Sequence, residues 1–191
     1  MSDLMLDVDQ AGELKAAFRR GDWTNAEIKR ACEGNFLAQV REVLLGRAEI
    51  KTVSHTIDCD ADPFVPEDWK VEEHKKGGRL LWDLAKVELF LSENQKDGNI
   101  IVGNKLRKEL ADKPVLNANV LDWLLAHPQL IPEEWKGKYI FFWGTIYRDS
   151  SGDLGVRCLY FYDGEWRWSV RWLGHDWHDL NPAALLASLS S

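Results

Sequence analysis

The sequence predicts an α+β fold, and three observations lead to this prediction. The first fifty residues have the apolar spacing of amphipathic helices, and short helical and strand-like segments follow them. In the last third of the chain, apolar and polar residues alternate between glycine-containing turns. We therefore expect a helical N-terminal unit at residues 1–50 and an α+β domain at residues 51–191. That domain should contain a Trp-rich, three-stranded antiparallel meander at residues 139–173 and a C-terminal helix at residues 182–190.

The composition is that of a globular protein with a core, because 45% of the 191 residues are hydrophobic and 29% are charged. The net charge of −7 opposes non-specific attraction to phosphate backbones and anionic membranes. No run approaches the roughly 18 consecutive apolar residues of a membrane span, and the N-terminus lacks a signal-peptide pattern. The three cysteines are scattered, which argues against a disulfide framework. We therefore expect a cytoplasmic protein without membrane contact.

Three short helices are expected in the N-terminal unit. Leu14, Ala17 and Phe18 lie on one face of the first helix. Thr24 and Glu27 have the spacing of a capping box, which predicts the start of the second helix. A third apolar stripe covers residues 36–44.

A hairpin and several helices are expected in the middle of the chain. Residues 51–57 alternate weakly and predict a strand, and residues 69–74 and 79–82 predict two strands joined by a Lys-Lys-Gly-Gly turn. Asp83 suits a helix N-cap before a further apolar segment. Two more helices are predicted at residues 103–111 and 117–126, and the second ends before Pro128.

The meander is the strongest structural signal. Its predicted strands are residues 139–148, 154–162 and 165–173, and Asp163-Gly164 predicts a type I′ hairpin turn between the last two. The turns set a register in which directly opposed residues share a face. One face collects Phe141, Trp143, Thr145, Tyr147, Arg157, Leu159, Phe161, Trp166, Trp168, Val170 and Trp172. The other face collects Ile140, Phe142, Ile146, Val156, Cys158, Tyr160, Tyr162, Glu165, Arg167, Ser169 and Arg171.

The first of these faces is expected to be mostly core, because each aromatic ring carries about 150–250 Å² of surface. Asn181-Pro182 has the pattern of a helix start, and the helix that follows should cover the apolar part of the second face. That arrangement leaves a polar and aromatic corner near solvent. The corner consists of Tyr160, Tyr162, Arg167 and Arg171.

The corner supplies the candidate binding residues, and three interpretations of it stay open. Tyr and Arg are enriched at protein interfaces, aromatic rings also stack on single-stranded bases, and charges blunt the edge of a sheet. Clustered aromatic and Arg side chains without a catalytic signature favour a non-catalytic binding or adaptor protein that contacts another protein.

Nucleic-acid binding is an alternative function. The predicted helices have helix-turn-helix lengths, but residues 10–50 hold seven Lys/Arg against six Asp/Glu. A phosphate-binding module normally has a more basic face.

A metal-dependent enzyme is the other alternative. The candidate metal ligands are His175, Asp176, His178 and Asp179, but no further ligand motif accompanies them. Neither a G-x-S-x-G nucleophile motif nor a glycine-rich nucleotide motif occurs, so the sequence favours neither an enzyme nor a bound cofactor.

Four segments resemble a recurrent family of uncharacterised bacterial proteins. They are GNKLRKEL at residues 103–110, PVLNANVLD at 114–122, LIPEEWKGK at 130–138 and FFWGTIYR at 141–148. The similarity spans about residue 79 to the end of the chain. It implies a bacterial, cytoplasmic setting and carries no activity, cofactor or functional residue.

Overall fold

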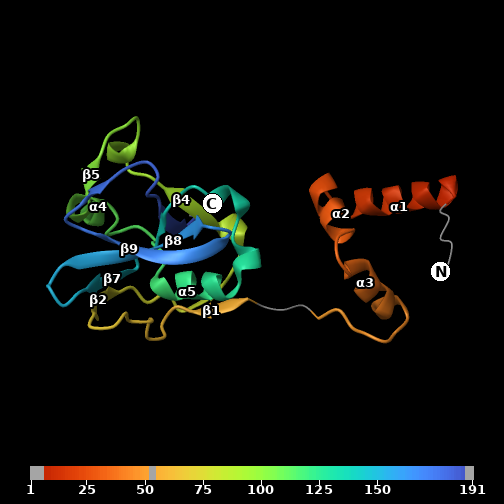
Figure 1. Cartoon of the computed structure of the whole chain (residues 1–191), viewed down its shortest axis with the longest axis horizontal. Helices are drawn as coiled ribbons and strands as arrows, with labels where there is room; N and C mark the ends of the chain where they lie inside the picture. Colours follow the sequence, from red (N-terminus) through yellow and green to blue (C-terminus); the bar gives the residue numbers. More distant parts are fainter. Residues whose placement is uncertain (1–6, 52–54, 188–191) are drawn as a thin grey trace. The chain divides into compact units, whose positions relative to one another are not determined.

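The computed structural model describes residues 7–51 and 55–187. The chain divides into two compact units, a helical unit at residues 1–53 and an α+β domain at residues 54–191 (Figure 1). The predicted combination of helices with a mostly antiparallel sheet is therefore present.

The helical unit contains the three predicted helices, α1 (Val8–Arg20), α2 (Asn25–Ala31) and α3 (Phe36–Leu44). The predicted capping box starts α2. The Thr24 hydroxyl accepts a hydrogen bond from the Glu27 backbone N–H at 3.3 Å, and the Glu27 carboxylate accepts one from the Thr24 backbone N–H at 2.7 Å. Both bonds satisfy donors that the helix itself leaves free.

A seven-stranded sheet forms the centre of the α+β domain. Its longest strand, β8 (Leu154–Tyr162), pairs on one side with β9 (Glu165–Trp172). On the other side it pairs with β7 (Thr145–Arg148) and β6 (Ile140–Phe141). Within the described chain, β9 pairs only with β8 and is therefore an edge strand.

The sheet continues beyond β6 and β7. Strand β2 (Lys70–His74) pairs antiparallel with β7, and β11 (Ala183–Leu186) pairs parallel with β6. Strand β4 (Val87–Phe90) then pairs antiparallel with β11. Two small sheets lie outside this one: β1 (Thr56–Asp58) with β3 (Arg79–Leu81), and β5 (Ile101–Val102) with β10 (Asp176–Trp177).

Two helices cover opposite faces of the sheet, α4 (Gly103–Glu109) and α5 (Ala118–Ala126) (Figure 1). Helix α5 packs in one core with Leu159, and α4 packs in the other with Cys158. Short 3₁₀ turns connect the remaining elements, at Leu84–Lys86, Glu93–Gln95, Pro128–Leu130 and Glu133–Trp135.

The predicted β8–β9 hairpin and its register are confirmed. Tyr162 pairs with Glu165, and Leu159 pairs with Trp168. The turn residues Asp163 and Gly164 have φ values of 51° and 82°. Positive φ at both central positions is what a type I′ turn requires.

The predicted first strand of the meander is wrong in one respect, because it is interrupted between β6 and β7. A turn at Trp143-Gly144 shifts the alternation of side chains by one residue. Phe141 and Trp143 consequently pack in the core beside Cys158, whereas Thr145 and Tyr147 remain on the predicted face with Arg157.

The predicted aromatic face is also less buried at its outer end than expected. Trp166 is half-buried and Trp168 is 38% exposed. The reason is their position in β9, which pairs with one strand only among the described residues. Trp168 contacts the ring of Phe64, 6.0 Å away, and the Arg157 guanidinium.

The predicted C-terminal helix at 182–190 is wrong. Ala183–Leu186 forms the strand β11, and residues 188–190 lie outside the described residues. The carbonyl of Ala184 accepts a bond from Leu116 N–H at 2.9 Å, while β4 and β6 pair with the strand. Pairing of β11 with β4 on one side and β6 on the other stabilises the strand more than the N-cap signal of Asn181 stabilises a helix. The Asn181 side chain instead accepts a hydrogen bond from the His178 N–H.

Two further predictions in the middle of the chain are wrong. Strands β2 and β3 do not form a hairpin, since β2 pairs with β7 and β3 with β1. Asp83 does cap a turn, with its side chain accepting a bond from Ala85 N–H at 3.1 Å, but that turn is 3₁₀ and strand β4 follows it. Short apolar runs such as Val87–Phe90 fit either a helix or a strand, and pairing with β11 decides between them.

Candidate functional site

The predicted binding corner is partly assembled at the turn end of β8 and β9. Tyr160 lies directly opposite Arg167, and Tyr160 stacks on Tyr139 with ring centroids 5.2 Å apart. The Arg167 guanidinium lies 5.7 Å from the ring centroid of Tyr162, which is 63% exposed. These four side chains form one aromatic and cationic patch, and Tyr139 is the member that the sequence did not indicate.

Arg171 does not belong to that patch. Its guanidinium donates two hydrogen bonds, at 2.8 and 2.5 Å, to the backbone carbonyl of Asp176 in β10. It also lies 5.9 Å from the ring centroid of Trp177. Arg171 therefore holds β10 against β9 instead of facing a partner.

The candidate metal ligands lie just before, within and just after β10. The side chains of His175 and Asp176 are exposed, and the His178 ring lies 3.5 Å from the Asp179 carboxylate. Across the parts of the chain that the structure describes, no three His, Cys, Asp or Glu side chains come together as a metal site would require.

A buried polar network joins β2, β7 and α5 around His74. One ring nitrogen of His74 lies 2.9 Å from the Thr145 hydroxyl, and the other lies 3.1 Å from the carbonyl of Cys59. The Thr145 hydroxyl accepts a bond from Ala118 N–H at 3.0 Å, so its own hydrogen is available to His74. A neutral ring with hydrogen on Nε2 fits both contacts.

The same network does not form a Cys–His catalytic pair, because His74 contacts the backbone carbonyl of Cys59 and not its thiol. Burial, with the charges of Asp60 and Asp58, raises the pKa of Cys59. Burial also raises the pKa of Cys158 to about 12. Both thiols are thus held in the protonated form, which is the poor nucleophile.

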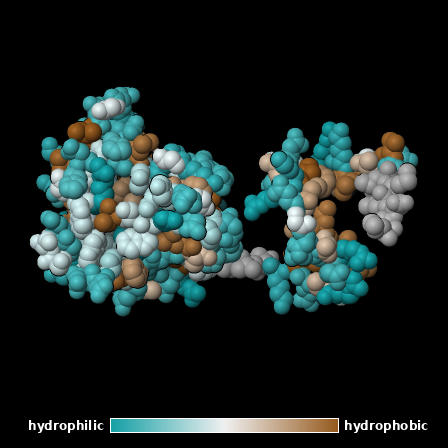
Figure 2. All heavy atoms as spheres, viewed as in Figure 1, coloured by the Kyte–Doolittle hydropathy of each residue, from teal (hydrophilic) through white to brown (hydrophobic). Residues whose placement is uncertain are grey.

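The helical unit presents an apolar surface. Among its described residues only Ala31 is buried. Figure 2 shows apolar residues running along this unit among hydrophilic ones. The exposed large apolar side chains are Val8, Leu14, Trp23, Phe36, Leu37, Leu44, Leu45 and Ile50.

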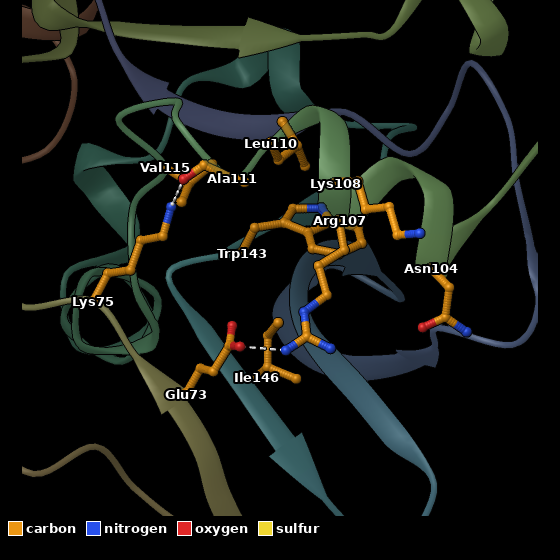
Figure 3. Close-up of a pocket in the computed structure, with 10 residues that line it drawn as sticks. All are labelled: Glu73, Lys75, Asn104, Arg107, Lys108, Leu110, Ala111, Val115, Trp143 and Ile146. Carbon is orange, nitrogen blue, oxygen red and sulfur yellow. Dashed lines mark hydrogen bonds and ion pairs between the residues drawn. The ribbon is translucent and has the colours of Figure 1, made fainter.

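The α+β domain contains a cavity of about 550 Å³ between α4 and the sheet (Figure 3). This volume lies in the range of small-molecule sites, roughly 300–1,000 Å³. Apolar side chains form its floor, including Trp143, which is only 3% exposed. The lining residues are Glu73, Lys75, Asn104, Arg107, Lys108, Leu110, Ala111, Val115, Trp143 and Ile146.

The rim of this cavity carries three cations and one carboxylate. Arg107 forms an ion pair with Glu73, and the Lys75 ammonium donates a hydrogen bond to the Ala111 carbonyl at 2.6 Å (Figure 3). Neither Lys108 nor the Asn104 amide has a hydrogen-bond or ion-pair partner among the described residues.

A signal for this rim is present in the sequence. Asn104, Arg107 and Lys108 have i, i+3, i+4 spacing within one predicted helix, which places them on one helix face. What the sequence could not indicate is that this face meets Lys75 and Trp143, because β2 and β7 bring those residues from distant parts of the chain.

No model of a known protein family matches the chain, and neither a curated protein nor a solved structure is similar enough to be matched with it. None of the helices that the structure describes has the length and apolar character to cross a membrane.

Proposed function

We propose that this chain is a non-catalytic binding protein that acts through protein–protein contact, with the helical unit as its contact surface. The observation that carries the proposal is the apolar surface of that unit. Leu37 is 55% exposed and Leu44 is 81% exposed, and they lie seven residues apart on one face of α3. Contiguous exposed apolar side chains of this kind mark interaction sites in soluble proteins.

The partner that we propose is a second copy of the same chain. Residues 7–51 contain eight Lys/Arg and eight Asp/Glu, so two helical units meet without net repulsion. Residues 55–187 contain sixteen Lys/Arg and twenty-two Asp/Glu, so two α+β domains repel each other. Self-association through the helical units therefore avoids the electrostatic repulsion that contact between two acidic α+β domains would cause.

The charges within α1 favour an antiparallel meeting of two such helices. Asp9 and Glu13 lie in its first half, and Lys15, Arg19 and Arg20 lie in its second half. In two antiparallel copies, the acidic half of each helix lies along the basic half of the other. The positive end of each helix dipole then also lies beside the negative end of the other, which is favourable.

The test is the molar mass of the full chain, measured by light scattering and by sedimentation at micromolar concentration. We expect a dimer, and we expect Leu37→Glu to weaken it at least tenfold, because a buried unpaired carboxylate is costly. Gln39→Glu is the matched control, since it adds the same charge to an exposed position of α3. A wild-type chain that stays monomeric, or a Gln39→Glu variant that dissociates as readily as Leu37→Glu, would disprove the proposal.

The aromatic and cationic patch of Tyr139, Tyr160, Tyr162 and Arg167 remains a proposed second contact surface. Its support is the exposure of Tyr162 beside Arg167 at the end of an edge strand. If neither Tyr160→Ala nor Arg167→Glu changes any crosslink to another protein, the proposal of a second contact surface is disproved.

A further inference from the structure

The cavity beside α4 is rich in hydrogen-bond donors and poor in acceptors. The Lys75 ammonium has three N–H donors and uses one of them for Ala111, and Lys108 uses none. Arg107 has five N–H donors, of which Glu73 takes up part. The Glu73 carboxylate is the one anionic group among the lining residues.

This cationic character stands out against the rest of the domain. The chain carries a net charge of −7, yet the rim of the cavity holds three cations against one carboxylate. A second cavity of about 240 Å³ shares Lys75 and Val115 with the first and adds Lys76 and Lys113. Five cationic side chains therefore gather around one region of an acidic protein. Such an arrangement concentrates anions.

The floor beneath the cations is apolar and aromatic. Trp143 and Ile146 both line the cavity, and Figure 3 draws the Trp143 ring next to the Arg107 side chain. An apolar floor with a few convergent polar groups is the usual construction of a small-molecule site. The indole N–H of Trp143 is buried without an acceptor among the described residues, so its resonance can report on changes in the cavity.

From this combination we infer that the cavity binds a small organic anion, with a phosphate or carboxylate group at the cationic rim and an apolar ring on Trp143. Lys75, Arg107 and Lys108 supply charge-assisted hydrogen bonds to the anionic oxygens. Asn104 adds a neutral donor from the same face of α4. The site lies wholly in the α+β domain, so this inference is independent of the self-association proposed above.

The probes that test the inference are phenyl phosphate, benzoate, inorganic phosphate and neutral benzyl alcohol, titrated into the full chain. Binding is measured by calorimetry and by the indole N–H signals in a two-dimensional ¹⁵N spectrum, with Trp143→Phe used to assign one of them. We expect the aromatic anions to bind more tightly than inorganic phosphate or benzyl alcohol, and to shift the Trp143 signal. Whichever of phenyl phosphate and benzoate binds with the higher affinity identifies the preferred anionic group.

Two charge reversals on α4 make the test specific. Lys108→Glu should weaken binding of the preferred aromatic anion by roughly fivefold or more, because it replaces a free cation at the rim. Lys105→Glu is the control, since Lys105 is exposed on the same helix but does not line the cavity. Equal weakening by both variants, no shift of the Trp143 signal, or binding of benzyl alcohol as tight as that of the anions would overturn the inference.

Discussion

Arg157 and Asp122 form a bidentate ion pair that fastens the sheet to α5. The Arg157 guanidinium donates hydrogen bonds to the two carboxylate oxygens at 2.6 and 3.0 Å. The Arg157 side chain is 1% exposed, and its guanidinium carbon lies 5.0 Å from the ring centroid of Phe64 and 4.5 Å from that of Trp168. Burial lowers the pKa of Arg157, but Asp122 and, to a smaller extent, Tyr147 favour the charged guanidinium, and together they raise the pKa overall.

Removal of the Asp122 charge should therefore destabilise the domain. In an Asp122→Asn variant, Arg157 stays buried and charged without a counterion, and we expect a loss of about 2–3 kcal/mol in the free energy of unfolding. Urea denaturation followed by far-UV circular dichroism measures this loss. The matched control is Glu72→Gln, which breaks the Glu72–Arg148 pair between side chains that are each 31% exposed and should cost less. Equal losses in the two variants would contradict the prediction.

Alkaline pH should also destabilise the protein, through Cys158. Burial raises the pKa of this thiol to about 12, from an ordinary value near 9. The unfolded chain therefore releases the thiol proton from about pH 9, whereas the folded chain keeps it. The contribution of the protonated Cys158 thiol to the free energy of unfolding is complete below pH 9 and falls by about 1.4 kcal/mol per pH unit as the pH rises toward 12.

A Cys158→Ala variant isolates this contribution from the other groups that titrate at high pH. Urea denaturation across this range should show a shallower fall in stability for the variant than for the wild type. Identical slopes would show that the Cys158 thiol does not cause the loss.

Helix α5 and the chain around Gly144 approach each other so closely that no side chain fits between them. A Cβ atom at position 144 would lie 2.8 Å from the Cβ of Asn117 and 2.9 Å from its backbone. We expect Gly144→Ala to reduce the free energy of unfolding by about 1–3 kcal/mol, because backbone must move to admit the methyl group. Gly174→Ala is the control, since nothing lies within 4 Å of the added atom. Thermal denaturation of both variants is the measurement, and an unchanged melting temperature for Gly144→Ala would refute this account.

The turn-driven parts of the fold were predictable from the sequence, and the parts that depend on distant pairing were not. Asp163-Gly164 specifies its hairpin locally, and Thr24 with Glu27 specifies a helix start locally. The segment Ala183–Leu186 carries equally clear helix signals, but its partners lie about a hundred residues earlier in β4 and forty in β6. Four apolar residues do not distinguish a helix from a buried strand.

The candidate sites divide in the same way. The hairpin register correctly places Tyr160 opposite Arg167. It does not indicate that Arg171 is bound to the carbonyl of Asp176, because that contact depends on how the chain turns after β9 and pairs β10 with β5. The cavity beside α4 likewise needs residues from three elements.

Hydrogen exchange distinguishes the strand β11 from the helix that the sequence suggests. In the structure, Leu186 N–H donates to the Pro114 carbonyl and Ala187 N–H donates to the Lys86 carbonyl, at 2.9 and 2.8 Å. A central strand should protect the amides of Ala184, Leu185 and Leu186 about as strongly as those of β8. In a helix that begins after Asn181, the amides of Ala183 and Ala184 would have no acceptor within the helix, so fast exchange at Ala184 would contradict the strand.

Residues 141–143 place aromatic rings on both sides of the sheet, because successive side chains of an extended chain point to opposite faces. Phe142 lies in the core with α5, while its neighbours Phe141 and Trp143 lie in the core with α4. We expect the core with α4 and the core with α5 to unfold together, because unfolding of residues 141–143 removes aromatic rings from both cores. The α+β domain should accordingly lose its two hydrophobic layers in a single all-or-none transition.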